Sequence, residues 1–221
     1  PGGAIIPAPY KERTEISFKT GKRIVEMVFE NLTPLKIMTK EAFENAVYVA
    51  SAIGASSNCP PHLTAIARHM GVDFNLDQWE KLGHRIPLLA NCQPAGEHLM
   101  EGFFKAGGIP AIMKELIKDN KLNIKALTVT GKTIEENLNM KIDVNRDVIK
   151  SYENPLSHNA GFIVMKSNFF SSAVMKTSVI SSEFRERYLS NKDSLNIFEV
   201  KAVVFEGPED YHTTINDDNL K

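Results

Sequence analysis

The chain has 221 residues, of which 43% are hydrophobic and 24% are charged, a composition typical of globular proteins that bury a core. Its formal net charge of −1 excludes the strongly basic field that is typical of nucleic-acid-binding proteins. No apolar run approaches the length of about 20 residues that a membrane-spanning helix needs, so we expect neither nucleic acid nor a membrane as a partner.

The cysteines and histidines show no disulfide or metal-binding pattern. Cys59 and Cys92 are the only cysteines and lack CxxC spacing, and the six histidines form no HExxH motif. This pattern predicts a reducing, cytoplasmic location. The chain begins PGGAIIPAPY, without Met and without the basic and apolar regions of a signal peptide. We therefore expect a fragment of a longer chain.

The first third of the chain is predicted to be helical after an irregular connector at 1–13, which contains three prolines. Apolar residues recur with helical spacing in 21–32 and again in 42–53. Between these stretches, Thr33 and Pro34 form a typical helix start, with a capping residue followed by proline.

The stretch 54–72, GASSNCPPHLTAIARHMGV, combines a turn of small residues with a helix. Gly54 to Asn58 are small or polar, an apolar stripe of helical spacing runs from Leu63 to Met70, and Gly71 is a plausible helix stop. Free N–H groups at the start of such a helix would suit a carboxylate or phosphate. On local physics alone, the preferred interpretation is an ordinary loop followed by a buried helix with a serine cap.

Strand-like and helical patterns alternate from there to residue 140. We expect a short helix at 75–82 with Trp79 packed inward, a buried strand at 86–90, helices at 96–105 and 109–119, and a strand at 126–129 before a helix through Leu138. The alternation predicts an α/β layered domain over 1–140.

Two polar motifs in this region are interpreted as structural. TVTGKT (128–133) resembles a phosphate-binding loop, but Ala126 stands where that loop needs glycine, so a strand, a turn and a helix start are preferred. His98 and Glu101 could share a helical face and line a cleft. A solvated pair is the preferred interpretation.

The character of the sequence changes after residue 140. Polar residues crowd 141–154, which is predicted to be a linker. Runs rich in β-branched residues predict strands at 162–165, 172–180 and 200–205, and 183–189 has a helical pattern. We therefore predict a second, mainly β unit over 155–221. Glu206 and Asp210 could bind a cation there, but a turn with exposed acids is preferred.

Several long motifs give the chain a family resemblance. GASSNCPPHLTAIARHMGV (54–72), QPAGEHLMEGFFKAGGIPAIMKEL (93–116), ALTVTGKTIEENL (126–138) and SAVMKTSVIS (172–181) occur in the order found in dehydratases of dihydroxy acids and sugar acids. AVVFEGPEDYH (202–212) resembles the branch that acts on arabinonate and xylonate. The chain departs from the family pattern at Ala55, Ser57 and Cys59, where Gly, Thr and Ala are usual.

The resemblance implies a hydro-lyase that converts a sugar acid into a 2-keto-3-deoxy acid. It implies an α/β/α layered N-terminal domain, followed by the start of a mainly β, barrel-like C-terminal domain, in a protein that is a homo-oligomer when complete. It also implies an iron–sulfur cluster, of the 2Fe–2S type, and Mg²⁺ as the Lewis acids of the reaction.

Most of the residues for this chemistry are expected outside the chain. In the family, the cluster cysteines lie upstream of the segment matched here and a catalytic serine lies downstream, so we assign no catalytic residue and no metal ligand to these 221 residues. Ser57 and Asn58 are the predicted substrate-binding residues. The alternatives are a branched-chain dihydroxyacid dehydratase and a truncated, non-catalytic relative.

Overall fold

The computed structural model describes residues 2–189 and 201–220. The chain divides into two compact units, Pro1–Val179 and Ile180–Lys221. The helices and strands of the first unit are α1 Lys11–Phe29, α2 Pro34–Ile37, α3 Lys40–Ala52, α4 Cys59–His69, α5 Leu76–Gln78, α6 Met100–Lys105, α7 Gly108–Lys118, α8 Ile134–Leu138, β1 Phe162–Met165 and β2 Ala173–Lys176. The second unit contains α9 Ser182–Phe184 and α10 Pro208–Thr214.

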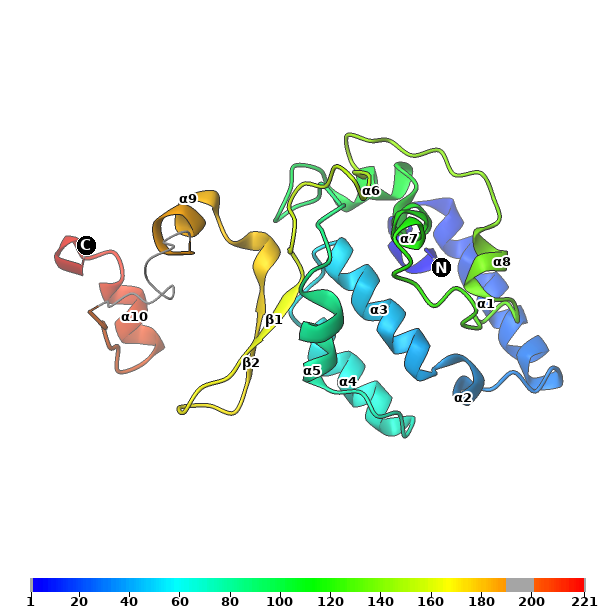
Figure 1. The fold of residues 1–221 in the computed structure, drawn as a ribbon, viewed down its shortest axis with the longest axis horizontal. Helices are drawn as coiled ribbons and strands as arrows, with labels where there is room; N and C mark the ends of the chain where they lie inside the picture. The colour runs from blue at the N-terminus through cyan, green and yellow to red at the C-terminus, as the bar shows by residue number, and fades with distance from the viewer. Residues whose placement is uncertain (1, 190–200, 221) are drawn as a thin grey trace. The chain divides into compact units, whose positions relative to one another are not determined.

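Helix α3 is central to the first unit (Figure 1), where it contacts α4, α7 and the helical turn Trp79–Gly83 that follows α5. One side of α3 packs Phe43 and Val47 in a core with Trp79 and Phe162. The ring centroids of Trp79 and Phe162 lie 5.0 Å apart in an edge-to-face arrangement. This contact fixes β1 against the helices.

A second core surrounds α7 and includes residues of α3, α6, α8 and several non-helical segments. Leu89, Ile112, Leu116 and Ile149 are fully buried in it. Glu115, also on α7, is only 3% exposed and receives hydrogen bonds from the side chains of Arg146 and Lys118 and from the backbone N–H of Tyr152. The polar segment 139–152 is therefore held against α7.

The sheet of the described residues is a two-stranded antiparallel hairpin. Its register pairs Phe162 with Lys176 and Val164 with Val174. The described architecture is mixed α and β, compatible with an α/β N-terminal domain. The layered arrangement, the barrel and the predicted domain boundaries remain predictions.

Most helices were predicted, but α1 corrects the prediction for residues 1–13. The connector was expected to be irregular, whereas α1 begins at Lys11 and Gly3–Ile5 forms a 3₁₀ turn. The first half of α1 is rich in Lys, Arg and Glu, so helix propensity favours it although no apolar period marks it.

The strands predicted at 86–90 and 126–129 are wrong. Residues 86–90 are buried, but the N–H groups of Leu88 and Leu89 bond to two different segments, at Ser157 and Ala52. Residues 126–129 form a tight turn in which Thr128 N–H donates to Lys132 O at 2.9 Å. A ladder needs several successive bonds to one partner strand, and neither segment has them.

The last strand predicted from the sequence, at 200–205, is not borne out in the described residues. Of the strand expected at 200–205, residue 200 lies outside the described residues and 201–205 have no regular secondary structure. The expected turn at 206–212 contains α10, and Asp210 accepts hydrogen bonds from Glu206 N–H and the Thr214 hydroxyl. The predicted helical segment 183–189 is confirmed by α9 and the helical turn Arg185–Leu189.

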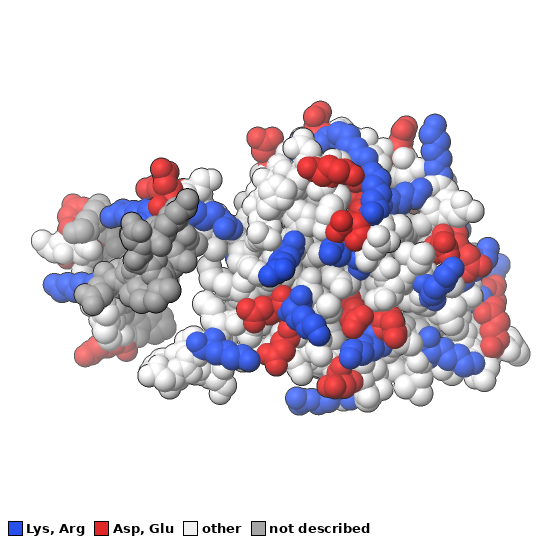
Figure 2. Space-filling model, viewed as in Figure 1, with Lys and Arg blue, Asp and Glu red and all other residues white. Residues whose placement is uncertain are grey.

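The surface carries charges of both signs. Figure 2 shows acidic and basic side chains interspersed on the face in view, in keeping with the net charge of −1. Among the described residues, none of the helices combines the length and the apolar character that a membrane crossing requires.

Candidate functional site

A cavity of about 770 Å³ opens in the first unit beside the turn that joins α3 to α4. Its walls come from that turn, the segment 90–94, α6 and β2. The lining residues are Ile53, Gly54, Ala55, Ser56, Ser57, Ala90, Cys92, Gln93, Pro94, Met100, Phe103, Val174, Met175, Lys176 and Val179. Three of the four motifs shared with the whole family, at 54–72, 93–116 and 172–181, thus line the same cavity.

The turn between α3 and α4 is compact because Gly54 takes a positive φ of 60°. A Cβ at this position would stand 3.0 Å from Leu88 Cδ1 and 3.2 Å from Ser178 Oγ, so both conformation and space favour glycine. The Ala55 N–H donates to Ala50 O at 2.9 Å. The turn therefore folds back on the end of α3 and presents its serines to the cavity.

The two predicted substrate-binding residues stand at different places in this wall. Ser57 lines the cavity, whereas Asn58, the next residue and also exposed, is not among the lining residues. Their predicted contact with substrate stays a prediction.

The start of α4 corrects the expectation of an anion site built from free N–H groups. The Cys59 N–H donates to Ser56 O at 3.0 Å and the His62 N–H donates to Asn58 O at 3.3 Å. Pro60 and Pro61 between them have no N–H. The first turn of α4 therefore has no free backbone donor to offer a carboxylate.

Lys176 is the one charged side chain among the described residues that line the cavity. It is half-buried at the end of β2. Burial lowers its pKa, and the nearby Cys59 thiol acts in the opposite direction. The sequence analysis missed this residue, although period-two alternation in 172–180 places Lys176 on the same strand face as Val174.

The opposite wall is a turn in the segment QPAG. The Gly96 N–H donates to Cys92 O at 2.8 Å, and Asn91 Oδ1 accepts from the Glu97 N–H at 3.0 Å. A Cβ on Gly96 would stand 2.5 Å from Asn91 C and Cys92 N, a separation that packed atoms do not tolerate. This close approach places Gln93 in the cavity wall.

The remaining sequence candidates take structural roles. Glu101 pairs with Lys105 at 2.7 Å and accepts the Tyr10 hydroxyl, and neither it nor His98 lines the cavity. The helical face expected for His98 and Glu101 is not formed, because α6 begins at Met100 and His98 precedes it.

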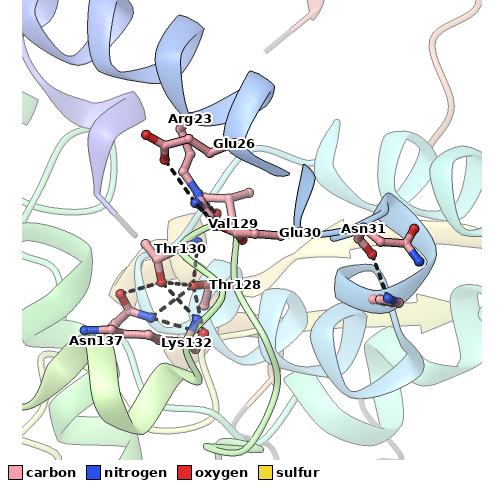
Figure 3. A network of polar contacts seen from close by, with 10 residues as sticks. Arg23, Glu26, Glu30, Asn31, Thr128, Val129, Thr130, Lys132 and Asn137 are labelled. Atoms are coloured by element: carbon pink, nitrogen blue, oxygen red, sulfur yellow. Dashed lines mark hydrogen bonds and ion pairs between the residues drawn. The ribbon is translucent and has the colours of Figure 1, made fainter. Parts of the chain in front are cut away.

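The TGKT turn is held by its own polar groups, as Figure 3 shows. Thr133 and Glu136 form a reciprocal helix cap. Thr128 Oγ1 lies within hydrogen-bond distance of Thr130, Lys132 and Asn137. On the other side, the Arg23 guanidinium donates to Val129 O at 2.7 Å. The expected helix start at Thr133 is present, whereas the strand expected before the turn is not formed.

The described residues do not by themselves form a site for a metal ion or a cluster. They contain no group of three His, Cys, Asp or Glu side chains placed to ligate one. Burial raises the pKa of both Cys59 and Cys92, which disfavours the thiolate that a cluster iron needs. An iron–sulfur cluster therefore does not fit these cysteines alone.

Comparison with known proteins shows which family the chain resembles in sequence. A family model described as dihydroxy-acid/6-phosphogluconate dehydratase N-terminal matches residues 1–137. The chain is 49% identical over 220 residues to a D-xylonate dehydratase of Caulobacter vibrioides, covering 100% of the chain and 37% of that protein.

Two further relatives are covered to a similar extent. An L-arabinonate dehydratase of Rhizobium leguminosarum is 40% identical over 99% of the chain and 36% of its own length. A dihydroxy-acid dehydratase of Acetivibrio thermocellus is 39% identical over 93% of the chain and 37% of its own length. The chain thus spans little more than a third of the curated relatives that it matches.

Proposed function

Because the chain belongs to the dihydroxy-acid/6-phosphogluconate dehydratase family, we propose that the complete protein is a hydro-lyase that dehydrates a sugar acid to a 2-keto-3-deoxy acid. The observation that carries this proposal is the 49% identity to a D-xylonate dehydratase over the whole chain. The 40% identity to an L-arabinonate dehydratase adds support. Both relatives are named for five-carbon aldonates, which are therefore the preferred substrates.

The cavity suits such a molecule in size and chemistry. Its volume of about 770 Å³ lies within the range of about 300–1,000 Å³ typical of small-molecule sites. Ser56, Ser57 and Gln93 provide hydrogen-bonding groups for hydroxyls, while Phe103 and Val174 supply apolar walls. Ser57 is assigned to the polar groups of the substrate, and Asn58 is assigned to the rim beside it.

The reactive groups of the complete protein are assigned to residues outside this chain. A 2Fe–2S cluster, Mg²⁺ and the base belong to the proposal through the family, and the Cys59 and Cys92 thiols hold none of them. The role of the residues described here is to bind and orient the acid. No step of the elimination is assigned to them.

The complete protein is also proposed to be a homo-oligomer. Helix α1 supports this assignment, because Val28 and Phe29 are 73% and 87% exposed and exposed apolar side chains of this size favour association.

A branched-chain dihydroxy acid is the alternative substrate, since the dihydroxy-acid dehydratase of Acetivibrio thermocellus is 39% identical to the chain. The third possibility is a relative without catalysis. The protein sequence on either side of these 221 residues separates the last possibility from the first two. Intact cluster cysteines upstream and the serine motif downstream favour an enzyme, and their loss favours a non-catalytic protein.

The direct test is an assay of the complete polypeptide after reconstitution with iron, sulfide and Mg²⁺. D-Xylonate, L-arabinonate, D-gluconate and a branched-chain 2,3-dihydroxy acid are supplied separately, and the 2-keto acid formed is measured. We expect the highest kcat/KM with a five-carbon aldonate. Turnover of the branched-chain acid alone would favour the alternative, and no turnover of any acid would contradict the proposal.

A further inference from the structure

The hairpin β1–β2 directs Lys176 toward the interior side of the first unit. Residues directly opposite each other in an antiparallel pair project from the same face, and Lys176 pairs with Phe162 while Val174 pairs with Val164. Phe162 and Val164 are only 1% and 6% exposed. The Lys176 side chain therefore projects from the buried face of the hairpin.

The charge on that face has no carboxylate partner among the described residues. Ion pairs within 4.0 Å are found for several described lysines, such as Lys166, which meets Asp77 at 3.3 Å from the same hairpin. None is found for Lys176 in the described part of the chain. Lys176 is half-buried, and removing even part of the water around a charge is costly. The lowered pKa reflects this cost.

The rest of the cavity lining is neutral. Ser56, Ser57 and Gln93 are uncharged hydrogen-bonding groups, and the first turn of α4 has its N–H groups bonded or replaced by proline. A ligand that fits this surface carries one negative charge near Lys176 and neutral hydroxyl groups near the serines. A sugar acid has this distribution of groups.

We propose that Lys176 binds the carboxylate of the substrate and thereby selects the acid over its neutral analogues. The inference rests on the proposed function for the identity of the acid, and on the hairpin register and the cavity for the residue. Lys176 is a binding residue in this assignment, since its ammonium contacts the carboxylate and takes no part in breaking bonds. In this assignment, an anion bound beside Lys176 offsets the cost of its partial burial.

The test compares variants of the complete, reconstituted protein. Lys176→Met removes the charge at similar length, Lys176→Arg keeps it, and Lys166→Met is the matched control on the same hairpin. Loss of a hydrogen-bonded charge pair corresponds to about a 10- to 100-fold loss in kcat/KM for D-xylonate. We expect this loss for Lys176→Met, partial recovery for Lys176→Arg, and wild-type kinetics for Lys166→Met.

Calorimetric binding of D-xylonate and of the neutral D-xylonamide separates a binding role from a structural one. The wild-type protein should bind the acid more tightly than the amide, and Lys176→Met should lose about 10-fold or more of that preference while its melting temperature stays the same or rises. An unchanged preference for the acid would overturn the assignment, whether or not the melting temperature falls. If the wild-type protein binds the acid but dehydrates no acid, the proposed reaction fails, and the binding ratio still decides the role of Lys176.

Discussion

Replacing Glu115 by Gln should strongly weaken the first unit. The carboxylate is 3% exposed, with Oε1 at 2.8 Å from Arg146 Nη2 and at 3.0 Å from Lys118 Nζ. Oε2 accepts the Tyr152 N–H at 3.1 Å. Gln keeps one acceptor oxygen, but its amide nitrogen would face one of these donors.

The size of the effect follows from the burial of each partner. Bonds to a charged group are worth about 1.5–3 kcal/mol each, but Arg146 and Lys118 are half-exposed and can turn to water, which reduces their share. In the glutamine variant, either the Tyr152 N–H loses its acceptor or the amide nitrogen faces Arg146 and Lys118. We therefore expect a loss of about 3 kcal/mol in the free energy of unfolding, or roughly 6–12 °C in melting temperature for a chain of this size.

The pH dependence gives an independent check. Burial raises the pKa of Glu115, but the hydrogen bonds from Arg146, Lys118 and Tyr152 outweigh it and leave the pKa below its usual value. A lowered folded-state pKa contributes stability that is present above the unfolded value and is lost as the pH falls through the folded value. The difference between wild type and Glu115→Gln should therefore shrink in acid.

Thermal unfolding followed by circular dichroism, at neutral pH and in acid, measures both effects. Glu135→Gln is the control, because Glu135 makes an exposed ion pair with Lys125 and such pairs contribute at most about 1 kcal/mol. Equal melting temperatures of wild type and Glu115→Gln at neutral pH would refute the reasoning. So would a difference that stays constant as the pH falls.

Three further substitutions test the walls of the cavity and the helix signals. Gly96→Ala should cost about 3 kcal/mol in unfolding free energy, because its Cβ would stand 2.5 Å from the backbone of Asn91, and an unchanged denaturation midpoint would contradict this. Thr133→Ala should cost about 1 kcal/mol by removing the cap of α8, measured in the same way, and a neutral effect would show that tertiary packing alone fixes this helix. The double substitution Cys59→Ser and Cys92→Ser should leave the visible cluster absorbance of the complete protein intact, and its loss would show that one of these thiols is a ligand.

The parts of the fold that the sequence predicted are those decided by neighbouring residues. Thr133 caps α8 with Glu136 three residues on, and Gly71 ends α4 with a φ of 68°. Trp79, the one tryptophan in a short helical pattern, is fully buried. Each of these features depends on a few adjacent positions, where capping and conformational preferences act directly.

The missed parts depend on contacts between distant segments. Nothing near 86–90 shows that Leu88 and Leu89 bond separately to Ser157 and Ala52, and a short apolar run cannot by itself distinguish a strand from other buried chain. Lys176 was missed for the same reason. Lys176 becomes part of the cavity only when the hairpin register places it beside the turn at Ser57.

The most direct test of the account is hydrogen–deuterium exchange of the complete, reconstituted protein with and without D-xylonate. The account places the substrate in the cavity between the α3–α4 turn and β2, so amides in 53–58 and 173–179 should exchange more slowly when the acid is bound. Residues 16–27, which line a separate groove on α1, should be unaffected. Protection confined to other segments, with 53–58 and 173–179 unchanged at saturating D-xylonate, would contradict the assignment of this cavity as the substrate site.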